Sequence, residues 1–246
     1  MTAANIVLIT GASRGIGAAT ARLAAANGFD VAVNYLRDKA AAAAVVADVE
    51  KAGRHAVAIQ ADMAREDDIE RLFATTDAEL GRLTHLVYNT GITGPLSRIE
   101  TLPSEAAREV LNVNVIGAFL CARAAIPRIS RKQGGAGGAM VFISSAMATL
   151  GGAGEYVMYA ASKGALESLS IGLARELAGE GIRANVVEPG PIATDIHPPG
   201  RLERITQSVP MARAGTVEEI AQAVVFLLSE HSSFTTAALL RVAGGR

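Results

Sequence analysis

The stretch VLITGASRGIG, residues 7–17, decides the fold, because a short apolar run there leads into a glycine loop and then into a helical pattern. Gly11, Gly15 and Gly17 let the chain turn sharply and let its backbone approach a phosphate closely. The free N–H groups at the start of the following helix offer hydrogen bonds and positive potential to that phosphate. This order predicts a dinucleotide-binding unit. A glycine turn without a ligand is the alternative.

The rest of the chain repeats the same alternation of apolar runs and helical patterns. Nearly continuous apolar runs are typical of strands that are covered on both faces. A repeated strand–helix order predicts a parallel sheet with right-handed crossovers. We therefore expect one doubly wound α/β domain over residues 1–246, with a seven-stranded parallel sheet. Strands are predicted at 5–10, 30–35, 55–60, 84–89, 139–144, 183–188 and 238–243, and helices near 15–27, 37–52, 65–80, 104–131, 157–179 and 216–229.

Composition narrows the class of function. Half of the 246 residues are hydrophobic and the net charge is −1, so attraction to nucleic acid or to an anionic membrane is not expected. Apolar runs fall short of the roughly 18 residues that a membrane span needs. The single cysteine, Cys121, cannot form an internal disulfide, which favours a reducing compartment such as the cytoplasm. No metal is expected, because the histidines lack metal-ligand spacing: His55, His85, His197 and His231.

One long segment follows neither a strand nor a helix pattern. It reads IHPPGRLERITQSVPMARAG, residues 196–215. Long irregular segments inside a compact domain are usually functional. We therefore expect a substrate lid near 195–214, not a domain boundary.

The sequence YVMYAASK, residues 156–163, suggests an acid–base group. Tyrosine has an ordinary pKa of about 10, which is too high for proton exchange at neutral pH. Tyr159 and Lys163 are one helical turn apart, so the lysine cation is expected to favour tyrosinate and to lower the Tyr159 pKa. Tyr156 lies about 10 Å from the lysine along the helix, too far for direct activation. The alternative is the face of an ordinary core helix.

TGASRGIG (10–17) and YAASK (159–163) together resemble the motifs of the short-chain dehydrogenase/reductase family, and the resemblance extends over the chain in length and motif order. It implies Tyr159 as the acid–base and Lys163 as the residue that holds the nicotinamide ribose. The family's catalytic serine precedes the tyrosine, and we choose Ser145 over Ser144, which we expect to cap a strand end.

Asn114 lies in NVNVIGAF, inside a helical pattern. Asparagine is a poor residue for a helix interior, so a kink or a bound water is expected there. The resemblance implies that Asn114 orients a water that links Lys163 to solvent.

The end of the second strand bears on the choice of cofactor. Enzymes that use NAD usually place Asp or Glu there, to bind the ribose hydroxyls. This strand ends in Asn34 and Tyr35, with Arg37 just beyond. Arg14 and Arg37 could pair with a 2′-phosphate, so we predict NADP(H) in preference to NAD(H). The alternative is that both arginines are solvated surface residues.

The resemblance implies further cofactor contacts. Asp62 would meet the adenine amino group, with the Met63 backbone beside it, although capping of a helix is an alternative role for Asp62. In LVYNTGI (86–92), Tyr88 and Thr90 depart from the family's Asn-Asn-Ala-Gly segment. In EPGPIATDI (188–196), Glu188 is unusual. The complete expected cofactor set is Gly11, Ser13, Arg14, Gly15, Ile16, Gly17, Asn34, Tyr35, Arg37, Asp62, Met63, Asn89, Thr90, Gly91, Tyr159, Lys163, Pro189, Gly190, Ile192 and Thr194.

The sequence thus predicts an oxidoreductase that transfers hydride between NADP(H) and a small carbonyl or alcohol. The motifs are most similar to uncharacterised oxidoreductases related to glucose dehydrogenases, but they do not fix the substrate. The family usually forms tetramers through helices that correspond to 104–131 and 157–179 here. It commonly has glycine where Ala237 or Ala238 stands. Two alternatives stay open: a non-redox activity with bound cofactor, and a catalytically silent protein that senses nucleotide or binds a partner.

Overall fold

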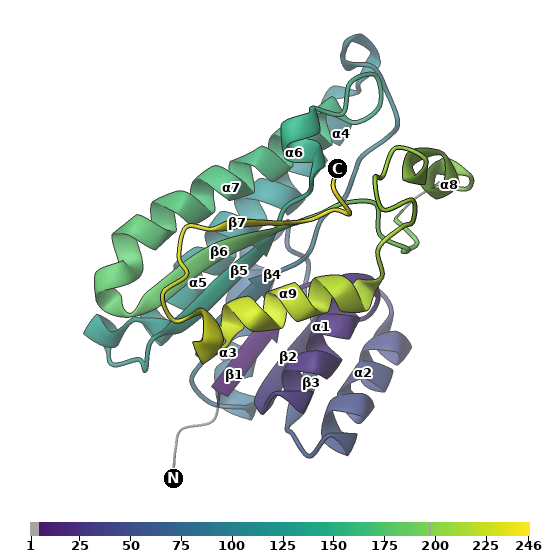
Figure 1. Ribbon diagram of the computed structural model, residues 1–246. Helices are drawn as coiled ribbons and strands as arrows, with labels where there is room; N and C mark the ends of the chain where they lie inside the picture. Colours follow the sequence, from purple (N-terminus) through teal and green to yellow (C-terminus); the bar gives the residue numbers. More distant parts are fainter. Residues whose placement is uncertain (1–4, 197) are drawn as a thin grey trace.

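The computed structural model describes residues 5–196 and 198–246, and its centre is a parallel sheet with strand order β3-β2-β1-β4-β5-β6-β7. After β3 the chain crosses back to pair β4 with the free side of β1 (Figure 1). This reversal creates a switch point between β1 and β4, where doubly wound folds bind ligands. The strands are β1 Asn5–Ile9, β2 Phe29–Tyr35, β3 Ala56–Gln60, β4 His85–Tyr88, β5 Gly138–Ile143, β6 Ile182–Pro189 and β7 Leu239–Val242.

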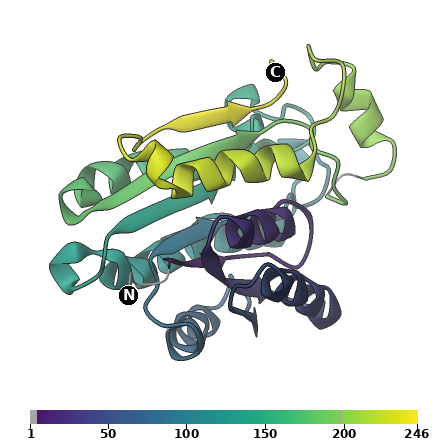
Figure 2. The ribbon, with the colours of Figure 1, turned by 60° about the horizontal axis from the view of Figure 1, so that its bottom comes forward.

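Helices cover both faces of the sheet, as the alternating pattern predicts (Figures 1 and 2). One layer contains α1 Gly15–Ala26, α2 Lys39–Lys51 and α9 Val217–Leu228; the other contains α3 Glu66–Glu79, α5 Gly117–Ile129 and α7 Val157–Leu177. Shorter helices, α4 Ser104–Leu111, α6 Met147–Leu150 and α8 Arg201–Thr206, lie toward the carboxyl ends of the strands.

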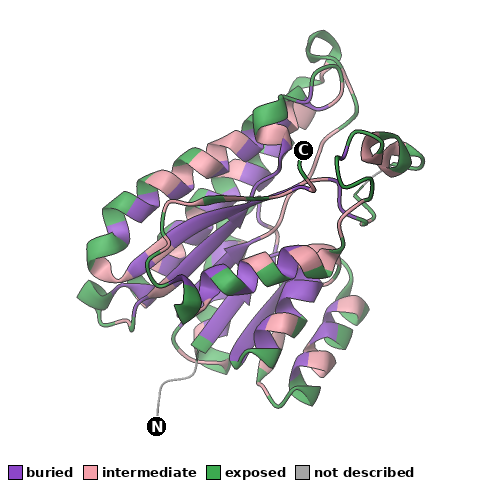
Figure 3. Ribbon diagram, in the orientation of Figure 1, coloured by how far each residue is buried: buried purple, intermediate pink, exposed green. Residues whose placement is uncertain are grey.

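The core has two halves, one on each face of the sheet. In β1, Ile6 and Leu8 pack toward α3 and α5, whereas Val7 and Ile9 pack toward α1 and α9. Every residue of β2 is buried (Figure 3). Burial on both faces explains the continuous apolar runs in the sequence. It also gives the loops at the carboxyl edge a rigid base.

Helices α4 and α5 form one long rod that is interrupted by a π-helical segment, Asn112–Ile116. The interruption lies where two asparagines predict a kink. The rod Ser104–Ile129 is long enough to span a membrane, and its most apolar 18-residue stretch has a mean hydropathy of 1.6 and is 44% buried. A core or interface helix passes the same test, and Leu111, Ile116 and Phe119 are exposed along this rod.

Two reactive side chains lie in the core. Cys121 is fully buried, with its Sγ 3.7 Å from Sδ of Met63, and burial raises the pKa of its thiol. His85 packs edge-on against Phe29, with ring centroids 5.0 Å apart. Burial, reinforced by the charge of Arg183, lowers the pKa of His85 to about 3. Among the described residues, no cluster of His, Cys, Asp or Glu is suited to hold a metal ion.

Candidate active site

A cavity of about 740 Å³ opens at the carboxyl ends of the strands, across the switch point between β1 and β4. The loops after β1 through β6 all contribute to its wall. Nearly all the expected site residues lie together there; the exceptions are Gly17, Tyr35 and Asn114, which do not line the cavity. Segments far apart in the sequence thus meet at one place, as the motif order predicts.

The glycine loop takes the shape that its sequence requires. Gly11 and Gly15 have φ values of +61° and +56°, in the left-handed region that favours glycine. Gly17 lies behind the loop, where an added Cβ would be 2.5 Å from the Gly11 carbonyl oxygen. Gly17 therefore allows close packing, whereas Gly11 and Gly15 shape the cavity wall.

Thr10, which the sequence analysis did not single out, fixes this loop to the end of β4. Its Oγ1 accepts the N–H groups of Asn89 at 2.9 Å and Thr90 at 3.0 Å. The Asn89 amide in turn donates to the carbonyls of Thr10 and Gly11, both at 3.0 Å. A buried threonine directly before the first glycine is the sequence signal that could have identified this role.

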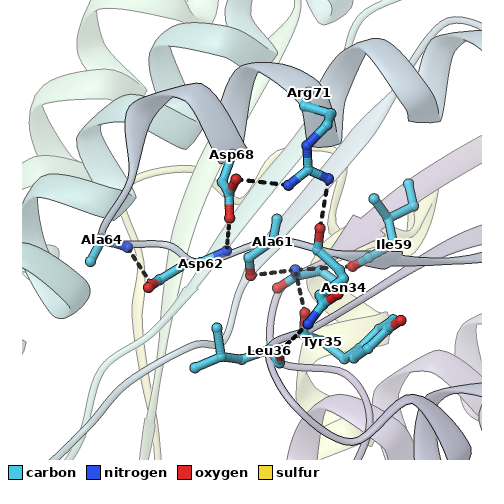
Figure 4. A network of polar contacts seen from close by, with 10 residues as sticks. Asn34, Tyr35, Leu36, Ile59, Ala61, Asp62, Ala64, Asp68 and Arg71 are labelled. Atoms are coloured by element: carbon cyan, nitrogen blue, oxygen red, sulfur yellow. Dashed lines mark hydrogen bonds and ion pairs between the residues drawn. The ribbon is translucent and has the colours of Figure 1, made fainter.

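Asn34 ties together the ends of β1, β2 and β3, and Figure 4 shows its bonds toward β3. Its Oδ1 accepts the Gly11 N–H at 3.0 Å, and its Nδ2 donates to the carbonyls of Ala61 at 3.1 Å and Ile59 at 3.3 Å. Asn34 lines the cavity, but its side-chain amide is already hydrogen-bonded to these backbone groups. The Tyr35 side chain belongs to the core. Asn34 therefore shapes the site mainly by fixing its backbone.

Asp62 and Met63 line the cavity after β3. The Asp62 N–H donates to the Asp68 carboxylate at 2.8 Å, and Asp62 Oδ1 accepts the Ala64 N–H at 2.9 Å (Figure 4). The Asp62 N–H, followed by Arg71, lowers the pKa of Asp68. The N-cap position of α3 is Arg65, so Asp62 stabilises the preceding turn and does not cap the helix itself.

The cavity has the polar groups that a dinucleotide needs. Arg14, at the N-cap of α1, makes no capping hydrogen bond with its side chain, so the first N–H groups of the helix lack a side-chain cap. The Thr90 Oγ1 is buried without a hydrogen-bond partner among the described residues. Helix termini of this kind bind phosphate. These features, with the glycine loop, fit a nicotinamide dinucleotide.

The two arginines expected at the cofactor are placed differently. Both are on the cavity wall, and Arg37 is exposed. Arg14 forms an ion pair with Asp195, at the start of the expected lid, and both side chains are mostly exposed. Such exposed pairs contribute little to stability, so a phosphate could displace Asp195 at low cost.

Tyr159 and Lys163 lie on the same face of α7 at the cavity wall. Nζ of Lys163 is 5.7 Å from the centroid of the Tyr159 ring and donates to the Ile143 carbonyl at 2.7 Å. Burial lowers the pKa of Lys163 to about 8. The helical spacing therefore brings the pair together as predicted.

The electrostatics of Tyr159 differ from the prediction. Burial raises its pKa, although the Ser145 hydroxyl and the charge of Arg201 act in the opposite direction. The expected lowering by Lys163 is not seen, because the lysine ammonium is directed at Ile143. Tyr159 is only partly buried on the cavity wall, so the cost of its ionisation is smaller than for the fully buried Tyr88.

The two serines after β5 have different partners. Ser145 lines the cavity beside Tyr159, where its hydroxyl acts to lower the Tyr159 pKa, and it accepts the Met147 N–H at 3.1 Å. Ser144 Oγ instead lies 2.7 Å from Oε1 of Glu167 and 3.0 Å from the Lys163 carbonyl oxygen. Ser145 is therefore the serine that acts on Tyr159, whereas Ser144 fixes β5 to α7.

Asn114 lies behind the cavity wall and holds the loop after β4. It accepts the Ile92 N–H at 2.8 Å and donates to the Ile92 carbonyl at 2.9 Å and to Ser162 Oγ at 2.9 Å. Tyr88, one of the departures from the family pattern, is buried and donates its hydroxyl to the Val113 carbonyl. The altered residue thus stabilises the π-helical segment that carries Asn114.

The segment after β6 completes the cofactor side of the cavity. Ala146 donates to the Pro189 carbonyl at 2.9 Å. An added Cβ on Gly190 would be 2.7 Å from Cα of Ala243, so the chain passes close to the strand beside it. Ile192 and Thr194 also line the cavity, and Thr194 Cγ2 would be 3.7 Å from a Cβ on Gly15. Thr194 therefore lies beside the glycine loop, where the chain enters α1.

Glu188 has a partner that the sequence did not reveal. It is buried beside α7, and its Oε2 is 2.8 Å from Nε of Arg241 on β7. Arg241 also donates to Thr149 Oγ1 at 2.7 Å. Burial, and then the Glu188 carboxylate, raise the pKa of Glu167. This cluster joins β6, β7 and α7 behind Ser145.

The expected lid leaves the body of the protein and returns to it at a neck, where residues before and after the lid are hydrogen-bonded to each other. The Gly215 N–H donates to the Pro191 carbonyl at 2.9 Å, and the Ala193 N–H donates to Gly215 at 3.0 Å. Beyond this neck the chain forms α8, whose Arg201 and Ile205 line the cavity. The segment 196–215, predicted to follow no helix pattern, thus contains the short helix α8. His197 lies outside the described residues.

Comparisons with known proteins agree with this geometry. A family model described as enoyl-(acyl carrier protein) reductase matches residues 11–246. The uncharacterized oxidoreductase YgfF of Escherichia coli (strain K12) is 45% identical over 245 residues, which cover 98% of this chain and 99% of that protein.

Two solved structures are also similar over nearly their full length. A blue fluorescent protein from a metagenomic library, in complex with NADPH, has a TM-score of 0.91 and 36% identity. A short chain dehydrogenase from Burkholderia cenocepacia J2315, in complex with NADP, has a TM-score of 0.91 and 35% identity. In both comparisons the match covers 98% of this chain and 97% of the other.

Proposed function

This chain belongs to the short-chain dehydrogenase/reductase family of oxidoreductases, and on that premise we propose that it uses NADP(H) to interconvert a carbonyl compound and its alcohol. The observation that carries the proposal is that Tyr159, Ser145 and Lys163 line one cavity, with Tyr159 and Lys163 on the same face of α7. This group lines the same cavity as the glycine loop.

The roles of the side chains follow from chemistry. Bound NADP(H) supplies or accepts the hydride at the substrate carbon. Tyr159 donates a proton to the substrate oxygen during reduction and removes it during oxidation. Ser145 holds the same oxygen by a hydrogen bond. Lys163 holds the nicotinamide ribose, and its positive charge favours tyrosinate when the ammonium turns from Ile143 toward the site.

The preference for NADP(H) is supported by charge. Arg14 and Arg37 line the cavity, and β2 ends without a carboxylate that would repel a 2′-phosphate. We expect Arg37→Gln to weaken NADPH binding by about tenfold to a hundredfold, the size of one charge-assisted hydrogen bond. NADH binding should change little. Calorimetric titration of both cofactors tests this, with Arg22→Gln, an exposed arginine paired with Asp48, as the matched control.

The activity is tested by following NADPH and NADH oxidation against aldehydes, ketones, quinones and 3-oxoacyl thioesters. NADPH-dependent turnover that Tyr159→Phe abolishes would support the proposal and identify a substrate class. A melting curve and an NADPH titration of the variant must show that it remains folded and binds cofactor.

Other outcomes lead to the alternatives. Turnover that survives in Tyr159→Phe would refute the assigned mechanism. NADPH bound and retained, with substrate converted but no net NADPH consumed, would indicate a non-redox activity. Tight NADPH binding without any conversion would favour a sensor or partner-binding protein.

Self-association as a homotetramer is proposed from the exposed apolar side chains of the α4–α5 rod. Ile116 and Phe119 are each about half exposed. Two such rods packed together would bury this surface. Light scattering should give the mass of a tetramer for the natural chain and a smaller mass for Phe119→Asp. A monomer in both cases would contradict the assembly.

A further inference from the structure

The lid brings a mostly buried cation to the wall of the active site. Arg201, from α8, lines the cavity with a side chain that is only 12% exposed. Its guanidinium carbon lies 4.9 Å from the centroid of the Tyr156 ring. That ring packs edge-on against Tyr159, with centroids 6.5 Å apart. One side chain therefore connects the lid to the surroundings of the expected acid–base.

Glu155 anchors this cation from the body of the protein. Its Oε2 lies 3.1 Å from Nη2 and 3.3 Å from Nε of Arg201. Its other oxygen pairs with Arg204, which is one turn further along α8 and far more exposed. Burial alone would raise the pKa of Glu155, but hydrogen bonds from Arg204 and Arg201 lower it. The carboxylate therefore holds two lid arginines, of which only Arg201 lines the cavity.

We propose that Arg201 is a positioning residue of the reaction: when the lid is held on Glu155, the guanidinium stabilises the tyrosinate form of Tyr159 and makes proton exchange dependent on lid closure. This rests on the proposed function. A positive charge near an acid–base acts through space, so the effect does not require direct contact with substrate.

The other charged and titratable groups around Tyr159 do not replace this effect. Lys163 faces it from α7 and Tyr156 from the position just before α7, while Glu155 faces Arg201 and Arg204. Glu109 of α4 and Arg246 line the same cavity. Burial raises the pKa of Tyr159, and Arg201 is the charged group that lowers it. Removing this charge should therefore raise the pKa of Tyr159.

The test compares Arg201→Gln with Arg204→Gln, since each removes one arginine from Glu155 but only the first removes a charge from the cavity. The pH dependence of kcat/KM for NADP⁺-dependent alcohol oxidation reports ionisation of the catalytic base. Arg201→Gln should move the acidic limb of this pH profile to higher pH and slow oxidation at pH 7 by roughly threefold to tenfold. Arg204→Gln should leave the acidic limb at its natural pH. Arg201→Lys, which keeps the positive charge, should return the limb most of the way to that pH.

Two results would overturn the proposal. A higher KM in Arg201→Gln with an unmoved limb would show that the residue only latches the lid. An equal shift in Arg204→Gln would show a general charge effect. A ¹³C NMR titration of tyrosines labelled at Cζ, with Tyr159→Phe for assignment, tests the effect of Arg201 on Tyr159 even if the proposed function is wrong. This titration needs no turnover, and Arg201→Gln must raise the Tyr159 midpoint relative to Arg204→Gln.

Discussion

A Cβ added to Gly91 would lie 2.9 Å from Nζ of Lys163, closer than a carbon at that position can normally come. Lys163 is only 3% exposed, and its ammonium is held by the Ile143 carbonyl. The loop after β4 and the lysine of α7 therefore fit together only because residue 91 has no side chain.

Gly91→Ala should displace the Lys163 ammonium and reduce kcat/KM by roughly tenfold to a hundredfold, as small misplacements of catalytic groups do. The fold should survive, because the clash is with the end of a flexible side chain. Gly172→Ala on the exposed side of α7 meets no atom within 4 Å. It should keep full activity and stabilise the helix by about 0.5–1 kcal/mol. Equal activity in both variants would contradict this role of Gly91.

Lys163 should lower the stability of the protein below pH 8. Burial lowers its folded pKa from 10.5 to about 8, so between these values the unfolded chain binds more protons than the folded one. The free energy of unfolding therefore rises with pH between about 8 and 10.5. Below pH 8 it is reduced by the full cost of burying the protonated lysine. Lys163→Met should be more stable than the natural chain by up to about 3 kcal/mol at pH 7.

Urea unfolding of both proteins at pH 7, 8.5 and 10 checks this expectation. The stability difference should shrink toward pH 10. A constant difference would mean that Lys163 does not titrate in this range.

His85 should make the protein sensitive to acid. Its folded pKa of about 3 lies below the ordinary 6.5, so the unfolded state gains a proton first as the pH falls. The stability of the natural chain should decrease from about pH 6.5 downward, by at most about 5 kcal/mol near pH 3. His85→Gln should lose less stability over this interval than the exposed control His231→Gln. Parallel pH profiles for the two variants would argue against the assignment.

Ala237 has a φ of 61°, in the left-handed region that L-residues with a Cβ avoid. Its N–H donates to the Ala184 carbonyl at 2.8 Å, which keeps the backbone in this conformation before β7. Ala237→Gly should therefore raise the free energy of unfolding by about 1 kcal/mol, since glycine removes the strain. Thermal unfolding measures the change, with Ala238→Gly as the control. Destabilisation by Ala237→Gly would show that the strain is negligible.

The sequence predicts the features that are local along the chain. The apolar runs locate the strands, the glycine loop lies at the switch point, and the spacing of Tyr159 and Lys163 places both on one helix face. Each of these depends on neighbouring residues and on the regular geometry of strands and helices. The asparagines of the α4–α5 rod likewise mark its π-helical interruption.

What the sequence could not supply is the choice of distant partners. Asn34 seemed placed for a cofactor, yet its amide is bonded to backbone of β1 and β3. The sequence did not explain Glu188, whose ion-pair partner Arg241 lies opposite it on the neighbouring strand β7. The Tyr88 hydroxyl meets Val113, in a different segment. Such pairings depend on sheet register and helix packing, which no local pattern specifies.

The strand order also has a consequence for the chain while it is being synthesised. β1 is an interior strand of the finished sheet, but on the ribosome it can pair only with β2 until β4 has emerged. The opposite edge of this apolar strand meanwhile has unpaired N–H and C=O groups, which favour aggregation. Truncated products that stop before His85 should therefore be targets for chaperones or proteases, whereas products that lack only β7 would keep every central strand paired.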